Sequence, residues 1–404
     1  MTENPSVRYV DAFPVEIKGK KMIYLRDPEG LAAEMAVPSA VYFLMAQMNG
    51  SRSPTDLLHA FAEQFKGASV SLDEVSHLIK RLDEALLLDN ARSQNQRQNN
   101  EVAFRQASVR PAAHAGQSYP SDEKALREMI DGFFDKGPGR PSDRREGHLK
   151  ALIAPHIDFN RGGPCFAYAY KALAESVPPD LFVVLGTGHA ARRPFVMSRK
   201  DFQTPFGTLC ADRDTIDRVA EIAPLDVFDD ELAHKEEHAI EFQAVFLKYL
   251  YPDSQIPFVP ILCGSFHEMV EKGKAPQSEP VIRDFVGGLR QVLEASGKRV
   301  CFISGVDLSH VGQRFGDAEL LDEEMVSGVE KVDRALLDRA CALDPDGYFD
   351  IVIRESDRTR VCGTSSIYTM LQLIDASRSE LLQYDHIVDY ETQQMVSFAS
   401  VAFH

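Results

Sequence analysis

The sequence lacks the features that would place the protein in a membrane or on nucleic acid. No apolar run approaches the roughly 18–20 residues of a membrane span, and the first residues have neither the basic start nor the apolar stretch of a signal peptide. Lys and Arg number 44 against 61 Asp and Glu, which gives a formal net charge of −17. Because phosphate neutralisation needs clustered cations, this charge argues against a nucleic-acid partner and against an anionic membrane surface.

Cysteine is scarce, and no two cysteines form a C-x-x-C pair. This scatter is typical of reduced thiols rather than of a disulfide framework, so we expect a cytoplasmic protein. The cysteines are Cys165, Cys210, Cys263, Cys301, Cys341 and Cys362. What the chain does have is 404 residues, of which 44% are hydrophobic, enough for two or three domains with sizeable cores.

The first 90 residues predict a small α+β domain. Two β-rich runs, residues 14–18 and 21–25, flank Gly19 and indicate a hairpin. A helical pattern over residues 38–48 stops at an Asn-Gly pair. Ser53 followed by Pro, and the capping box that opens at Ser71, predict the starts of two further helices.

A polar segment over residues 91–110 follows and predicts a linker to a second domain, residues 111–404. The N-terminal unit resembles PqqD-like, winged-helix domains, mainly through residues 48–53 and the end at residues 85–88. That resemblance implies recognition of a peptide. The alternative is a packing domain that binds no ligand. DNA binding is disfavoured because residues 1–90 carry a net negative charge, with nine Lys and Arg against thirteen Asp and Glu.

Strands and helices alternate beyond residue 111, which predicts an α/β domain with a mainly parallel sheet covered by helices on both faces. We predict strands at residues 151–155, 181–188, 257–262, 300–306, 380–390 and 396–403. We predict helices at residues 123–134, 166–173, 214–222, 236–250, 279–294, 317–340 and 365–374.

Three of these strands are each followed by a histidine. His156 and His189 follow the first two, and Asp307 and His310 follow the strand at residues 300–306. Ligands of open α/β sheets bind at the carboxyl ends of the strands, where these side chains could meet. Imidazole is the commonest protein ligand of transition metals, so the pattern predicts a metal site.

Six motifs in a fixed order resemble the Memo family, also called AmmeMemoRadiSam system protein B. They are HAGQSY (residues 114–119), IAPH (153–156), LGTGH (185–189), EHAIE (237–241), DLSHVGQRF (307–315) and VCG (361–363). The resemblance implies a fold similar to the class III, LigB-like extradiol dioxygenases. It also implies an iron or copper ion held by His156, His189 and Cys362, and association with a radical-SAM protein.

The residues around these ligands suggest supporting roles. We expect Asp307, His310 and His238 to manage protons, and Glu241 to line the substrate pocket. His114 could line the same pocket, or it could only tie down the chain where the linker enters the domain. A helix beginning just after Cys362 favours its thiolate form.

This chain departs from the family pattern at Asp158, since Memo proteins typically continue the Pro-His with Ala-Gly-Tyr. Asp158 could bind the metal or a substrate cation, or it could simply pair with Arg161. Because a thiolate ligand favours copper(I) or zinc over hard iron chemistry, zinc is also considered.

Three functions follow from these features. The first is a metal-dependent redox enzyme acting on a small or peptidic substrate. The second is a non-catalytic metal- or peptide-binding protein that partners a radical-SAM system through its N-terminal domain. The third is a zinc hydrolase, because His234 and His238 frame an H-x-x-E-H motif whose spacing predicts both imidazoles on one helical face.

Overall fold

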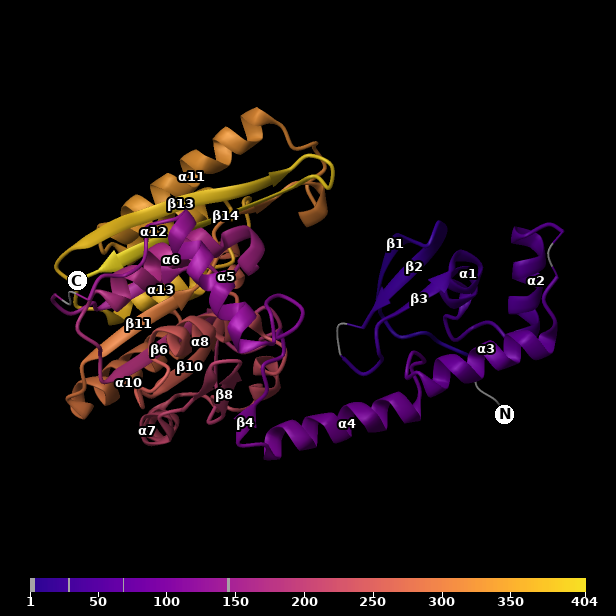
Figure 1. Ribbon diagram of the computed structural model, residues 1–404, viewed down its shortest axis with the longest axis horizontal. Coiled ribbons are helices and arrows are strands. Elements are labelled where there is room, and N and C mark those ends of the chain that lie inside the picture. Colours follow the sequence, from indigo (N-terminus) through magenta and orange to yellow (C-terminus); the bar gives the residue numbers. More distant parts are fainter. Residues whose placement is uncertain (1–3, 28–29, 68, 144–145) are drawn as a thin grey trace. The chain divides into compact units, whose positions relative to one another are not determined.

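The computed structural model describes residues 4–27, 30–67, 69–143 and 146–404. Its contacts divide the chain into two compact units, Met1–Gln106 and Ala107–His404 (Figure 1). None of the helices in the described ranges combines the length and the apolar content that crossing a membrane requires.

The first unit has one antiparallel sheet and helices packed around a single apolar core. The predicted hairpin is present, and Lys18 and Gly19 at its turn both have positive φ, as a tight two-residue turn requires. Both predicted caps are confirmed, because Ser53 and Ser71 each form a reciprocal capping box. The elements are β1 (Asp11–Ile17), β2 (Lys20–Arg26), β3 (Met35–Pro38), α1 (Ser39–Gln47), α2 (Pro54–Gln64), α3 (Leu72–Glu84) and α4 (Ala91–Gln106).

Most of the segment predicted as a linker is helix α4. The side-chain oxygen of Asn90 accepts hydrogen bonds from the backbone N–H groups of Arg92 and Ser93, which stabilises the first turn. The segment is rich in Gln and Arg, which are good helix formers, but has too few apolar residues for a helical period to be visible. The division between the two units falls after Gln106, within the segment predicted as a linker.

The second unit is built on a mixed eight-stranded sheet with a parallel centre. The strands β5 (Ala151–Ala154), β11 (Val300–Gly305), β6 (Leu181–Thr187) and β10 (Phe258–Cys263) are parallel and adjacent in this order. The flanking strands are antiparallel: β7 (Phe195–Met197), β12 (His310–Val311), β13 (Ser379–Asp389) and β14 (Gln394–Phe403).

The α/β class is thus confirmed, but the sheet is mixed rather than mainly parallel. The difference arises because β13 and β14 form a hairpin and β14 then pairs antiparallel with β5. A second, three-stranded sheet contains β4 (Val109–Arg110), β8 (Asp201–Thr204) and β9 (Gly207–Leu209).

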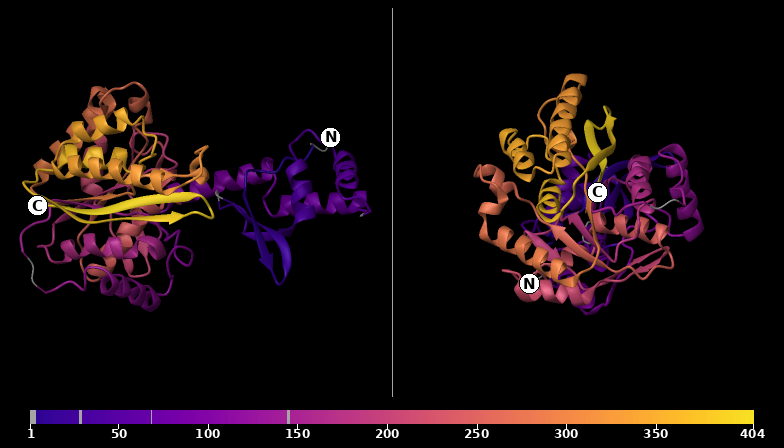
Figure 2. Two further views of the ribbon diagram at one scale, coloured as in Figure 1. Left: turned by 90° about the horizontal axis from the view of Figure 1, so that it is seen from above. Right: turned by 90° about the vertical axis from the view of Figure 1, so that its left-hand side faces the viewer.

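Helices cover both faces of the large sheet, as Figure 2 shows. Successive residues of β11 face opposite helical layers. The Ser304 hydroxyl bonds to that of Ser366 in α13 at 2.7 Å. Gly305 faces α8 instead, because a Cβ added there would lie 2.6 Å from the carbonyl oxygen of Ala239. Each helix predicted for this unit has a counterpart. The helices are α5 (Glu123–Lys136), α6 (Phe159–Ala174), α7 (Arg213–Ile222), α8 (His238–Leu250), α9 (His267–Glu271), α10 (Pro280–Ser296), α11 (Glu323–Cys341), α12 (Pro345–Arg354) and α13 (Thr364–Leu373).

Candidate metal centre

The predicted ligands lie at the carboxyl ends of the parallel strands. His156 follows β5 and His189 follows β6, and β11 lies between these two strands. Cys362 comes from the turn before α13. Gly363 holds this turn against the end of β11, because its N–H donates to the carbonyl of Asp307 at 3.1 Å and a Cβ there would lie 2.7 Å from that oxygen. A close backbone approach that only glycine allows therefore brings the cysteine to the strand ends.

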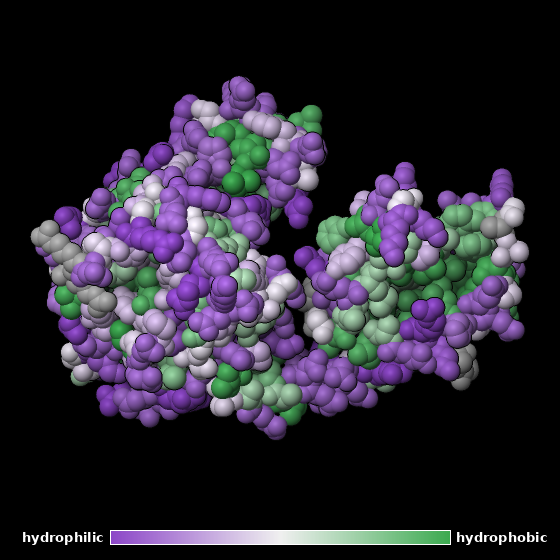
Figure 3. All heavy atoms as spheres, viewed as in Figure 1, coloured by the Kyte–Doolittle hydropathy of each residue, from purple (hydrophilic) through white to green (hydrophobic). Residues whose placement is uncertain are grey.

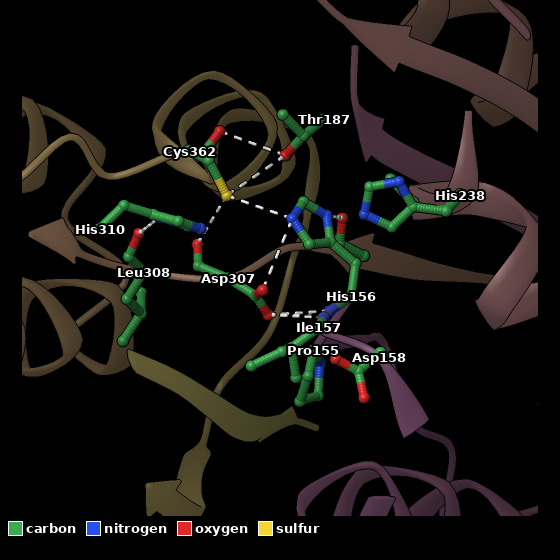
Figure 4. Close-up of polar contacts among 12 residues, drawn as sticks. Pro155, His156, Ile157, Asp158, Thr187, His238, Asp307, Leu308, His310 and Cys362 are labelled. Carbon is green, nitrogen blue, oxygen red and sulfur yellow. Dashed lines mark hydrogen bonds and ion pairs between the residues drawn. The ribbon is translucent and has the colours of Figure 1, made fainter. Parts of the chain in front are cut away.

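His156, His189 and Cys362 bring their donor atoms together. The Sγ of Cys362 lies 3.3 Å from Nε2 of His156, and the three ligand atoms are all within 4.8 Å of one another. Figure 4 shows the sulfur facing the His156 ring. Two imidazoles and a sulfur at this spacing match the donor set of a soft or borderline transition metal.

Hydrogen bonds orient both imidazoles for metal binding. Nδ1 of His156 lies 3.2 Å from the carbonyl oxygen of Gly305, and Nδ1 of His189 lies 3.0 Å from Glu237. Since a carbonyl and a carboxylate only accept, both Nδ1 atoms carry a hydrogen. Nε2 of His156 therefore presents a lone pair, and Nε2 of His189 presents one once the raised pKa of that ring is overcome and its second proton is lost. This arrangement is typical of the partners that fix a metal-ligating histidine, so the residues present fit a metal ion.

Asp307 lies beneath His156. Its Oδ1 accepts hydrogen bonds from the backbone N–H groups of His156 and Ile157, at 2.9 and 3.1 Å, and its Oδ2 lies 3.7 Å from Nε2 of His156 (Figure 4). Burial raises the pKa of Asp307 to about 7. Asp307 therefore fixes the backbone that carries the first ligand.

His310 and His238 approach the cluster from opposite sides in Figure 4. Nδ1 of His310 donates to the carbonyl of Leu308 at 3.1 Å, which leaves its Nε2 free to accept a proton. The His238 ring centre is 4.9 Å from those of both His156 and His189. Burial lowers the pKa of His310 and of His238 to about 4, so both rings are neutral at pH 7.

The three predicted ligands have different charge preferences. Burial holds the pKa of His156 well below its usual value. Burial acts the same way on His189, but its hydrogen bonds to Cys362 and Glu237 raise its pKa to about 10. Burial raises the pKa of the Cys362 thiol, an effect opposite in direction to the one expected from the helix terminus.

Glu241 and His114 have structural contacts in addition to any role in a pocket. Glu241 is fully buried and accepts hydrogen bonds from Arg110, from the backbone of Ala113 and His114, and from the Tyr119 hydroxyl. His114 lies 5.7 Å from His238, ring to ring, while its Nε2 bonds to the carbonyl of Glu236. The pair therefore connects the start of this unit to α8.

Asp158 caps helix α6. Its side chain accepts from the backbone N–H of Arg161 and pairs with the Arg161 guanidinium. Figure 4 shows its carboxylate pointing away from Cys362. The structure therefore favours the pairing of Asp158 with Arg161 over metal binding by Asp158.

His234 does not join His238 on one helical face. His234 ends a short 3₁₀ turn, Glu231–His234, and α8 begins only at His238. Its buried ring bonds to the carbonyl of Val196 at 3.0 Å, and burial lowers its pKa to about 3. No candidate metal cluster among the described residues contains it. The predicted helical H-x-x-E-H geometry is wrong, because the chain breaks the helix inside the motif.

Glu237 is a site residue to which the sequence pattern assigned no role, although it opens the EHAIE motif. It is the N-cap of α8, and its carboxylate accepts from the His189 backbone at 2.9 Å and the Ala239 backbone at 3.1 Å. The available signal was the position of Glu237 next to His238 in the EHAIE motif.

Comparisons with known proteins identify the family. The chain matches the family described as Memo-like protein over residues 110–402. It is 29% identical to a MEMO1 family protein of Aquifex aeolicus over 99% of this chain and 100% of that protein. It is 32% identical to a MEMO1 family protein of Methanopyrus kandleri and 30% identical to one of Thermococcus kodakarensis, over 73% of this chain and 98% and 99% of those proteins. The chain therefore belongs to the Memo-like protein family.

Proposed function

We propose that the chain is a metal-dependent redox enzyme that binds one iron or copper ion through His156, His189 and Cys362 and acts on a small or peptidic substrate. The observation that carries this proposal is the convergence of one nitrogen from each imidazole and one sulfur within 4.8 Å, while Nδ1 of each ring bonds to an oxygen of the protein. Three protein donors leave positions open for substrate.

A bound iron or copper ion would supply electron transfer and Lewis acidity at this point. The protein would supply orientation and proton handling. Glu237 fixes the His189 ring and Asp307 fixes the His156 backbone, whereas His310 and His238 are neutral bases beside the ligands. The sulfur ligand favours copper(I) or zinc over hard iron chemistry, so the identity of the metal is the first quantity to measure.

The test is metal analysis of full-length protein that has been purified anaerobically without added metal. We expect about one iron or copper ion per chain, lost in Cys362→Ala because the anionic ligand is removed. Cys341→Ala is the matched control, since Cys341 is also a partly buried thiol but belongs to neither candidate cluster. Metal content that is unchanged in Cys362→Ala, or metal-free wild-type protein, would contradict the proposal.

We also propose that the first unit recruits a peptide or a radical-SAM protein. Phe13 and Ile17 support this, because both are partly exposed on β1, which is an edge strand of the sheet that the described residues form. Figure 3 shows hydrophobic residues gathered on part of the surface of this unit. Screening a fluorescent peptide library against the full chain, with a Phe13→Ser/Ile17→Ser variant, tests it. Peptide binding that the double variant leaves unchanged would exclude this surface.

A further inference from the structure

A second group of metal-type donors lies beside the first and shares one residue with it. His189, Glu237 and His238 each offer a ligand atom, and these atoms are within 4.8 Å of one another. Oε1 of Glu237 lies 3.0 Å from Nδ1 of His189 and 3.2 Å from Nδ1 of His238. We call these three residues the carboxylate cluster.

The spacing within the carboxylate cluster suits a cation. Around a tetrahedral ion with N and O ligands at about 2.0–2.2 Å, neighbouring donor atoms are about 3.3–3.6 Å apart. The two contacts of Glu237 are close to that range, so exchanging a proton for an ion between these atoms needs only small side-chain movements.

Burial and access also favour a cation. The Glu237 side chain is only 4% exposed, and burying a carboxylate is costly unless opposite charge is nearby. Protonated His189 supplies that charge in the metal-free protein, and a bound cation would supply it in place of the proton. The His189 and His238 side chains are 43% and 31% exposed, which gives solvent a path to the cluster and leaves positions open for water.

We propose that His189, Glu237 and His238 form a second cation site, suited to zinc or copper(II). His189 then bridges two ions, with Nε2 directed to the His156 and Cys362 side and Nδ1 directed to Glu237. Binding requires Nδ1 of His189 to release its proton to solvent, and no oxidation or reduction is involved. The second site goes beyond the proposed redox function and does not depend on its substrate.

The test is a titration of chelator-treated, reduced full-length protein with zinc, followed by calorimetry and by metal analysis after desalting. We expect about two ions per chain in the wild type and about one in His238→Phe, which removes a donor from the carboxylate cluster alone. His267→Ala controls for surface binding, because His267 forms an exposed pair with Glu271 and should leave the ratio at two. Anomalous diffraction should then locate the second ion between His189 and Glu237.

The two proposals fail in different ways. A wild-type ratio of one that persists in His238→Phe but is lost in Cys362→Ala overturns the second site and supports the first. A ratio of one that persists in Cys362→Ala but is lost in His238→Phe supports the carboxylate cluster and contradicts the proposed ligand set. A second ion that survives in His238→Phe also overturns the second site.

Discussion

Replacing Glu241 by Gln should destabilise the second unit strongly. Glu241 and Arg110 are both 0% exposed and are 2.6 Å apart. The same carboxylate accepts from the backbone N–H groups of Ala113 and His114 and from the Tyr119 hydroxyl. A glutamine amide has the same shape, but its NH₂ group would point at groups that are themselves donors. Among them, only the Tyr119 hydroxyl can rotate and accept a hydrogen bond.

The expected loss follows from this geometry. Removing one partner of a buried ion pair leaves the other charge uncompensated and costs about 3–5 kcal/mol, against a total free energy of unfolding of about 5–15 kcal/mol. Arg110 keeps hydrogen bonds to the carbonyl oxygens of His234 and Glu237, which favours the lower end of that range. Because the chain has no Trp, unfolding in urea is best followed by circular dichroism.

A matched control separates structure from substrate binding. Glu236→Gln changes an exposed carboxylate only a few residues away and should cost less than about 1 kcal/mol. A loss below about 1 kcal/mol for Glu241→Gln as well would refute the reasoning. Weakened substrate binding with unchanged stability would instead assign Glu241 to the substrate pocket.

Three further predictions concern packing, pH and metal. Gly305→Ala should cost about 1–3 kcal/mol by overpacking against α8, whereas Gly287→Ala in α10, where a Cβ meets open space, should be neutral or stabilising in the same urea assay. Burial raises the pKa of Asp333, so its contribution to stability is complete below its usual pKa of about 4 and is lost as pH rises through the folded value. The wild type should therefore lose stability relative to Asp333→Asn as the pH rises above about 4, and urea midpoints that change in parallel would contradict this. Copper(I) at about 100-fold above Kd should stabilise the wild type by about 2.7 kcal/mol but not Cys362→Ala, which a thermal-shift assay under reducing conditions measures.

Local patterns were sufficient for most elements of the fold. The capping boxes at Ser53 and Ser71 and the turn at Gly19 predicted element starts and ends correctly, because they depend on hydrogen bonds within a few residues. Local patterns placed the start of α6 at residue 166, which is too late. The helix begins at Phe159 because Asp158 caps it and Gly163 allows the Phe133 ring to pack closely.

In the candidate site, too, some residues could be identified from local sequence and others could not. The histidines after β5 and β6 were visible because apolar runs end at them, and the parallel arrangement of these strands brings both to one edge. Cys362 lacks such a local signal, and it was identified only through the resemblance to the Memo family. Likewise, the H-x-x-E-H spacing could not reveal that the helix breaks after His234.

The sequence alone determined four features, because each depends on composition or on neighbours a few residues apart. They are the acidic net charge, the alternation of strands and helices, the helix caps and the histidines at strand ends. The convergence of Cys362 with His156, 206 positions earlier, depends on strand order and on the close backbone approach at Gly363. The pairing of Glu237 with His189 likewise arises only when α8 packs beside β6. Such contacts join segments that no local hydrogen bond or hydrophobic period relates, so only the packed structure establishes them.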